Sequence, residues 1–458
     1  MSYPFEEYQP PMEQNQPPVQ PQSQPQPPQK KSKKKKVLFT ILSVAIAISC
    51  FLTGMLATWL ALDKEIRSLI KLKASIQGLY YEEVTDEEFY NTVFEAINGG
   101  LLDSYSEYLT EEEYAEMQLA GMGNQSGLGV VISAQAADGT PQIRIVRVCG
   151  NSPAEAAGIK DGDMILGFGN AEGQITESNS FEEMSVFLSG KAAGEDLWLK
   201  IQSGGEVKTL KIQKQAYVEN YVFYRTSTAA YRFSGEEATV LTEGGSLLAS
   251  LPTDTAYIRL TQFNGNATEQ FDGAMNLFRE QGKKNLVLDL RDNGGGYLDI
   301  MQDIASYFCK TATDDEPVCA IADYGDYTQS FAATENVYNE YFSSDSRICV
   351  LADDGTASAS EALMGCMLDY GAIDYDDICL IDRGGVAKTY GKGIMQTTFP
   401  LGILNPDAVK LTTARICWPV SNTCIHDRGI VKADGTHSTV ESYIYDVEVT
   451  NCISALFN

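Results

Sequence analysis

Histidine and closely spaced cysteine pairs are scarce in this chain of 458 residues. There are two histidines, His426 and His437, and no C-x-x-C motif. Zinc sites are built from clusters of these residue types, so we expect no metal site and no cofactor. A Ser-His-Asp triad would have to recruit one of the two histidines, and His426, which follows the turn after Trp418, is better explained as a structural residue.

Several catalytic signatures are also missing. The sequence has no G-x-S-x-G elbow. Gly391 and Lys392 resemble the end of a P-loop, but no glycine lies five residues before Gly391. Ser68 and Lys71 match the S-x-x-K pattern of penicillin-recognising enzymes without the companion S-D-N and K-T-G motifs. These absences argue against all three enzyme classes.

Positive charge is under-represented, since 34 lysines and arginines stand against 62 aspartates and glutamates, a net charge of −28. Residues 1–36 hold six lysines and three glutamates, a local charge of +3, which leaves −31 for the remaining residues. A surface that acidic repels phosphate backbones. Nucleic acid is therefore not an expected partner.

One stretch lacks charge altogether. The segment 37–62 runs for 26 residues without a charged side chain, which is long enough to span a bilayer. Residues 1–36 are a Pro- and Gln-rich tail, expected to be disordered, that ends in a run of lysines. Because positively charged flanks stay in the cytoplasm, we expect a single-pass cell-membrane protein, anchored by residues 37–62, whose later residues are extracytoplasmic. A cleaved signal peptide is the alternative, but residues 58–61 fit a cleavage site poorly.

The ten cysteines leave the disulfide pattern open. Cys50 lies in the apolar stretch, and the nine others cannot all pair within one chain. Many lie in apolar runs, where a cysteine acts as a small buried hydrophobe. Cys417 and Cys424 could bridge across the turn between them.

The length predicts several structural units. Residues 63–117 are predicted to be helical, with Thr110 as an N-cap and Glu113 at the capping-box position. One interpretation is a spacer that holds the remaining chain away from the membrane, and the other is a functional role.

Residues 118–215 are predicted to form a compact β-rich unit. Gly127-Leu128-Gly129-Val130 precedes a strand, and residues 151–165 read as a short helix that ends on glycine and a turn into another strand. Together these segments resemble a PDZ domain, in which such a glycine loop offers backbone N–H groups to the C-terminal carboxylate of a bound peptide. A purely structural β-domain is the alternative.

Residues 216–458 alternate strand-like runs with helical patterns and are predicted to be the catalytic core. Two glycine-rich turns lead from a strand into a helix, at 294–296 and 355–358, and glycine lets the backbone approach a ligand closely. The whole chain is therefore predicted to be a multidomain α+β and α/β protein with an N-terminal transmembrane helix. The apolar runs predicted to be strands are 256–263, 285–290, 348–351 and 378–381.

Ser358 stands where the strand 348–351 turns into a helix, between two alanines too small to block a substrate. A helix N-terminus favours developing negative charge, so a nucleophile suits this position. A serine hydroxyl needs a base within reach, and a lysine serves when burial lowers its pKa. Lys392 lies between two glycines further on, and Gln396 follows it by four residues.

Five segments carry a family resemblance. In chain order they are LLDSYSEYLTEEEY, DLRDNGGG, TASASEALMG, YGKGIMQ and KLTTAR, and the last four lie behind the PDZ-like unit. This arrangement resembles the carboxyl-terminal processing proteases, Ser-Lys peptidases of the tail-specific type. The likeness extends from about residue 75 to residue 435.

The resemblance implies a role for each site residue. Ser358 would be the nucleophile, Lys392 its general base and Gln396 the residue that orients the lysine. The oxyanion hole would use the backbone N–H groups of Ala359 and of the glycine run, with Gly295 as the expected donor.

Two features depart from the family pattern. The interval of 34 residues between Ser358 and Lys392 is longer than expected. It makes Lys388 a rival base, although Lys388 lacks the flanking glycines and the glutamine four residues on. Gly294 replaces the usual proline before the glycine pair.

These observations predict a membrane-anchored, extracytoplasmic serine endopeptidase. Its PDZ-like unit would capture proteins or peptides by a free C-terminus, and the resemblance implies apolar C-terminal residues and self-association into dimers or larger assemblies. The alternative is a catalytically inactive scaffold that only binds protein C-termini.

Overall fold

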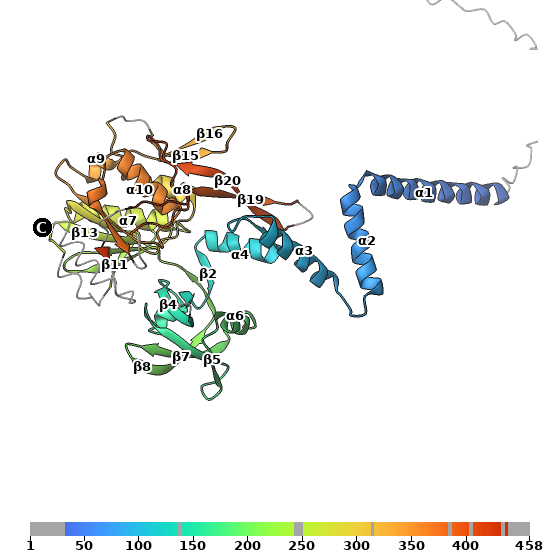
Figure 1. Cartoon of the computed structure of the whole chain (residues 1–458), viewed down its shortest axis with the longest axis horizontal. Coiled ribbons are helices and arrows are strands. Elements are labelled where there is room, and N and C mark those ends of the chain that lie inside the picture. Colours follow the sequence, from blue (N-terminus) through green and yellow to red (C-terminus); the bar gives the residue numbers. More distant parts are fainter. Residues whose placement is uncertain are drawn as a thin grey trace, which may run out of the picture. The chain divides into compact units, whose positions relative to one another are not determined.

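The computed structural model describes residues 33–135, 140–241, 251–312, 316–382, 387–402, 406–431 and 436–437 (Figure 1). The chain divides into two compact units, residues 1–92 and 93–458. The tail predicted to be disordered lies almost entirely outside the described residues.

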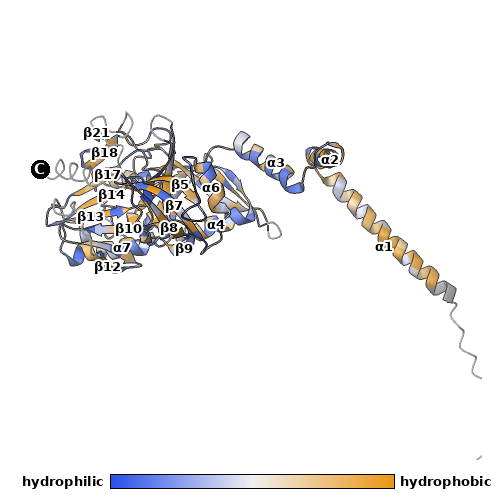
Figure 2. Ribbon diagram, turned by 90° about the horizontal axis from the view of Figure 1, so that it is seen from below, coloured by the Kyte–Doolittle hydropathy of each residue, from blue (hydrophilic) through white to orange (hydrophobic). Residues whose placement is uncertain are grey.

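The first unit begins with α1 (Lys33–Ala61), of which Val37–Ala61 is long and apolar enough to cross a membrane. Figure 2 shows this helix as a nearly continuous hydrophobic ribbon. Such a helix is consistent with a membrane anchor or with a signal sequence. α2 (Lys64–Leu79) follows, and α3 (Asp86–Gly100) begins at residue 86 and runs into the second unit.

The predicted helical region 63–117 contains α2, α3 and the start of α4 (Glu111–Gly121), but it also contains a short strand. β1 (Glu107–Leu109) separates α3 from α4 and pairs antiparallel with β20 (Ala408–Cys417). The predicted capping box at Thr110 is confirmed, because the Thr110 N–H donates to Glu113 Oε2 at 2.9 Å and the Glu113 N–H donates to Thr110 Oγ1. The residues just before α4 therefore belong to the second unit.

A β-rich unit follows α4. Its antiparallel sheet has the order β3-β4-β5-β7-β8, with β6 on β5, and β3 is an edge strand. Alternate side chains of β4 and β7 are fully buried and form its core, as the period of two in a half-buried strand requires. β2 and β9 form a separate two-stranded ribbon. The elements are β2 (Asn124–Gly127), β3 (Val130–Gln135), β4 (Pro141–Val148), α5 (Pro153–Ala156), β5 (Met164–Gly169), β6 (Ile175–Glu177), α6 (Phe181–Ser189), β7 (Asp196–Ser203), β8 (Glu206–Gln213) and β9 (Gln215–Val218).

The core of the second unit is a mixed sheet of the order β12-β11-β10-β13-β14-β17-β18-β21. Its centre, β13 to β18, is parallel, and every residue of β14 and β17 is buried, as expected for strands covered on both faces. The predicted strand–helix–strand unit around Ser358 is confirmed by β17, α10 and β18. The elements are β10 (Val222–Arg225), β11 (Ala230–Ser234), β12 (Glu237–Leu241), β13 (Thr255–Leu260), α7 (Ala267–Glu280), β14 (Asn285–Asp289), α8 (Leu298–Ala305), β17 (Ile348–Ala352), α10 (Ala359–Asp369), β18 (Ile378–Asp382) and β21 (Thr436–His437).

A second sheet has the order β1-β20-β15-β16, with β19 paired to β20. Among the described strands β19 pairs with β20 alone, so its other edge is open. The remaining elements are β15 (Val318–Asp323), β16 (Thr328–Ala332), α9 (Tyr338–Tyr341), the short 3₁₀ helix Tyr375–Asp377 and β19 (Ile394–Pro400).

The cysteines are mostly free thiols in the described part of the chain. Cys417 and Cys424 face each other across an isolated antiparallel bridge, but both are free, so the disulfide considered from the sequence is not formed. Cys379 is disulfide-bonded.

Gly365 of α10 should tolerate a larger side chain poorly, because Trp418 packs directly on it. A Cβ at Gly365 would lie 2.0 Å from Trp418 Nε1. We expect Gly365→Ala to destabilise the protein by about 1–3 kcal/mol through overpacking, measured by thermal unfolding. Gly99→Ala is the matched control, since Gly99 is also helical and a Cβ there meets nothing within 4 Å. Equal melting temperatures for the two variants would contradict this account of the packing.

Candidate active site

The two glycine-rich turns lie side by side because β14 and β17 are parallel neighbours. The carboxyl ends of parallel strands meet at one edge of a sheet, where α/β proteins place their sites. The turn after β14 is fastened to the turn after β17 by hydrogen bonds. The Ala357 N–H and Ser360 Oγ both donate to the Asn293 carbonyl at 3.0 Å, and the Asp292 N–H donates to Asp353 Oδ1 at 2.9 Å.

Ser358 sits at the N-terminus of α10 in a strained conformation. Its φ is 59° and its ψ is −116°, a region that residues other than glycine rarely adopt. The side chain is only partly buried. Ala359, the first residue of α10, therefore presents its backbone N–H at the same helix end as the serine.

Gly295 lies directly against Ser358. Its φ is 95°, and a Cβ there would be 2.6 Å from the Ser358 Cβ and 2.8 Å from the Ala359 nitrogen, so no side chain fits. The Gly295 N–H donates to Asn293 Oδ1 at 3.0 Å. As an oxyanion donor, Gly295 would have to share or exchange that bond.

A buried ion pair supports the turn that carries Gly295. The Arg291 Nε donates to Asp289 Oδ1 at 2.9 Å, and Tyr257 donates its hydroxyl to the other carboxylate oxygen. Arg291 and Asp289 are fully buried. Burial would raise the pKa of Asp289, but the Arg291 guanidinium outweighs it and holds that pKa at about 2. Both groups therefore stay charged and paired at neutral pH.

Glu361 is a central residue that the sequence reasoning missed. Its carboxylate is fully buried and accepts the backbone N–H groups of Ser358 (2.9 Å), Lys392 (2.9 Å) and Gly391 (2.8 Å), as well as the Thr389 hydroxyl. Burial raises the pKa of Glu361 against the opposing effect of these donors. One side chain thus joins the turn of the candidate nucleophile to the loop of the candidate base. The S-x-x-E spacing from Ser358, a capping-box pattern, is the signal that could have revealed it.

Lys392 lies just before β19 and is partly buried. Its Nζ lies 5.0 Å from the centre of the Tyr105 ring. Burial lowers its pKa, helped by the positive charge of Lys410 and opposed by Asp103 and Glu361. A lowered pKa is what a lysine general base requires. Among the described residues no hydrogen bond joins Lys392 Nζ to Ser358 or to Gln396.

The Gln396 side chain bonds to Thr412, whereas the sequence predicted that it would orient Lys392. It lies on β19, and its side-chain amide donates to Thr412 Oγ1 at 3.2 Å. Lys388 forms an isolated bridge with Val431.

The candidate residues surround one cavity of about 700 Å³. Ser358, Lys392 and Gln396 line it together with Gly295 and Ala359, whereas Lys388 is not among its described lining residues. One wall is apolar, and α4 closes another side. The apolar wall consists of Leu298, Ala362, Ile394, Ile416, Trp418 and Ile425, and α4 contributes Tyr114, Met117 and Gln118.

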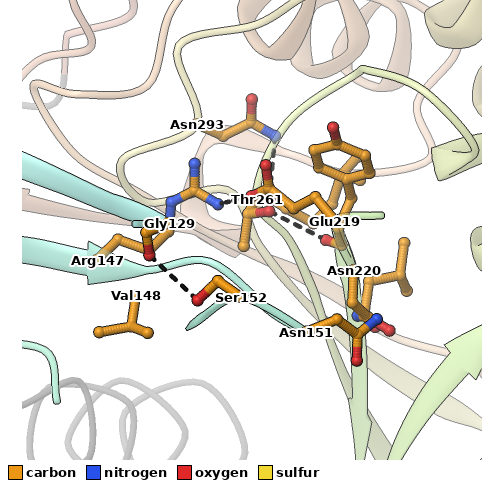
Figure 3. A network of polar contacts seen from close by, with 12 residues as sticks. Gly129, Arg147, Val148, Asn151, Ser152, Glu219, Asn220, Thr261 and Asn293 are labelled. Carbon is orange, nitrogen blue, oxygen red and sulfur yellow. Dashed lines mark hydrogen bonds and ion pairs between the residues drawn. The ribbon is translucent and has the colours of Figure 1, made fainter. Parts of the chain in front are cut away.

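The predicted peptide-binding loop Gly127-Leu128-Gly129-Val130 lies apart from this cavity, at the start of β3. Gly129 has a φ of 79°, and its carbonyl accepts the Ser152 hydroxyl at 3.3 Å. In the same β-rich unit, Arg147 on β4 forms a buried ion pair with Glu219 at 2.8 Å (Figure 3). This pair joins the β-rich unit to the segment that leads into β10.

Several known proteins are similar to this chain. The family model described as "Peptidase family S41" matches residues 254–433. A carboxyl-terminal-processing protease of Picosynechococcus sp. is 29% identical over 322 residues, covering 69% of this chain and 66% of the relative. A protein of Staphylococcus saprophyticus named "Probable CtpA-like serine protease" is 24% identical over 408 residues, covering 88% of this chain and 72% of the relative. This chain therefore spans about two thirds of the length of these relatives.

Among solved structures, a photosystem II D1 C-terminal processing protease is similar, with 22% identity and a TM-score of 0.48, and the match covers 85% of this chain and 92% of that one. The family match and the curated relatives define a serine-type peptidase domain. Residues 254–433 match peptidase family S41, and the chain is similar to the carboxyl-terminal processing proteases.

Removal of the Glu361 carboxylate should separate the two halves of the site. We expect Glu361→Ala to lower kcat/KM on a peptide by on the order of 10²-fold, because small misplacements of reacting groups cost that much. The far-ultraviolet circular dichroism spectrum should show that the variant is folded, and Glu361→Gln, which retains one acceptor oxygen, should lose less. A folded Glu361→Ala protein with the parent's kcat/KM would refute the linking role.

Proposed function

We propose that the protein is a peptidase in which Ser358 and Lys392 act as nucleophile and general base. The observation that carries this proposal is that both side chains line one cavity, while a single buried carboxylate, Glu361, binds both of their backbone N–H groups. Ser-Lys pairs are a known variant of the triad logic.

In the proposed reaction the neutral Lys392 amine takes the hydroxyl proton as Ser358 Oγ attacks the carbonyl carbon of the scissile peptide bond. The carbon–nitrogen bond then breaks, and the Lys392 ammonium returns the proton to the leaving amine. Water hydrolyses the resulting ester by the same route and restores Ser358. Because apo geometries are commonly looser than those of the reacting complex, the lack of a Lys392–Ser358 hydrogen bond among the described residues is compatible with this role.

The negative charge on the carbonyl oxygen would fall at the N-terminus of α10. The Ala359 N–H lies there, and the helix dipole favours negative charge at this end. Gly295 would provide the second donor after exchanging its bond with Asn293. Gln396 would turn from Thr412 to hold the Lys392 amine without adding a charge that would raise its pKa.

The substrate would bind as an extended strand. The open edge of β19 lines the cavity, and an exposed edge offers backbone groups to an added strand. The apolar wall with Trp418 and Ile416 would take an apolar side chain. The β-rich unit would act as a PDZ domain, with the loop at residues 127–130 receiving the substrate's C-terminal carboxylate and edge strand β3 pairing with its last residues.

The α1 helix would anchor the protein in the cell membrane, with residues 63–458 outside the cytoplasm. The lysine run before the span supports this orientation. A substrate with a free C-terminus would then be met on the outer side of the membrane.

The dyad is tested by Ser358→Ala and Lys392→Ala, with Lys388→Ala as the matched control. Each dyad variant should lose peptidase activity by on the order of 10⁴-fold but still bind a peptide that has a free apolar C-terminus, as measured by fluorescence anisotropy. Lys388→Ala should cut at the parent's rate. If the parent protein binds such peptides and cuts none, the protein is a scaffold. If Lys388→Ala alone is inactive, the base is misassigned.

The topology is tested separately. A protease added outside intact cells should digest residues 63–458, because those residues are proposed to be extracytoplasmic, whereas a cytoplasmic reporter protein should survive. Protection of residues 63–458 until the cells are lysed would reverse the orientation.

A further inference from the structure

A segment distant in sequence brings Tyr105 to the candidate base. Residues 107–109 pair with β20, and Ser106 Oγ accepts the Thr412 N–H at 2.8 Å, a contact between residues 306 positions apart. Tyr105 is thereby held with its ring 5.0 Å from Lys392 Nζ.

Tyr105 is fixed on its other side as well. Its hydroxyl donates to the Tyr390 hydroxyl at 3.2 Å, and Tyr390 is two residues before Lys392. The Tyr390 N–H in turn donates to the Thr356 carbonyl at 2.9 Å, in the turn that carries Ser358. Tyr105 is only partly buried, so filling the hydrophobic core does not account for its position.

The contact affects the charge state of the lysine. The face of an aromatic ring attracts a cation, so this position favours the ammonium form, which cannot act as a base. The hydrogen bond with Tyr390, followed by burial, raises the pKa of Tyr105 to about 12. The phenol is therefore neutral, and its ring rather than a phenolate meets the amine.

The other charged groups that face Lys392 come from three elements. Lys410 of β20 disfavours the ammonium, while Asp103 before β1 and Glu361 of α10 favour it. Asp427 acts on Tyr105 itself. Burial and Lys410 are thus opposed by two carboxylates and, on this geometry, by the Tyr105 ring.

We infer that Tyr105 is a positioning residue that holds the Lys392 amine over its ring when the site is empty, and that productive binding moves the amine to Ser358. The inference rests on the proposed Ser-Lys function and adds a resting position for its base. In that position the ring favours the charged form of the amine, and the amine is not bonded to the serine, so the pair is inactive until substrate is bound.

The test uses the full chain in detergent micelles, with Ser358→Ala as the parent so that the measurement is independent of turnover. The pKa of Lys392 is measured from the pH dependence of trace acetylation, read for this residue by mass spectrometry. Tyr105→Leu removes the ring but keeps an apolar side chain of similar enclosure. Tyr105→Phe is the matched control, since it keeps the ring and loses only the bond to Tyr390.

Loss of the ring removes a group that stabilises the charged amine, so Tyr105→Leu should lower the Lys392 pKa by about half to one unit. Tyr105→Phe should leave it near the parent value. In the chain that retains Ser358, the acid limb of the kcat/KM profile should move to lower pH by the same amount for Tyr105→Leu.

Two results would overturn the inference: an unchanged or raised Lys392 pKa in Tyr105→Leu, or an equal fall in both variants. A shift of the expected sign in a protein whose Ser358 form cuts no peptide would support the holding contact and disprove the peptidase. The two ideas can therefore fail separately.

Discussion

The candidate site depends on one buried carboxylate. Burying a charge is costly unless hydrogen bonds replace its water, and Glu361 receives donors from four residues: Ser358, Thr389, Gly391 and Lys392. Three of the four donors are backbone N–H groups, so the carboxylate fixes the position of the backbone rather than the conformation of a side chain. The cavity between α10 and β19 owes its shape to this arrangement, because moving either loop would leave both the carboxylate and its donors unsatisfied.

Backbone strain at Ser358 follows from the same constraint. A residue with φ 59° and ψ −116° persists only where its surroundings over-determine it. Here the Ser358 N–H is held by Glu361, and Gly295 packs against the Cβ so closely that it has no room for a side chain. The buried pair of Asp289 and Arg291 lies directly before the glycine turn in the chain. The strained conformation of Ser358 is thus held by the Glu361 hydrogen bond and by the close approach of Gly295.

Local patterns predicted much of the fold. The strands around 285–290, 348–351 and 378–381 and the Thr110 cap could be read because each depends on neighbours within a few residues. The position of Ser358 at a strand-to-helix turn followed from them. The pairing of residues 107–109 with β20 could not be read, because it joins segments about 300 residues apart and a three-residue strand has no periodicity. The short strand within the predicted helical region 63–117 was therefore missed, and Tyr105 with it.

The balance at Lys392 explains why these long-range contacts matter. Burial and Lys410 favour a neutral amine, and Asp103 and Glu361 favour an ammonium. Lys410 and Asp103 come from segments joined by the β1–β20 pairing, which also places Tyr105. The charge state of the base therefore depends on burial first and also on the pairing of the N-terminal segment with the catalytic sheet. A lysine in the same G-K-G loop, without that segment, would lose one charged neighbour, Asp103, and its aromatic partner, and its pKa would be set by burial, Lys410 and Glu361.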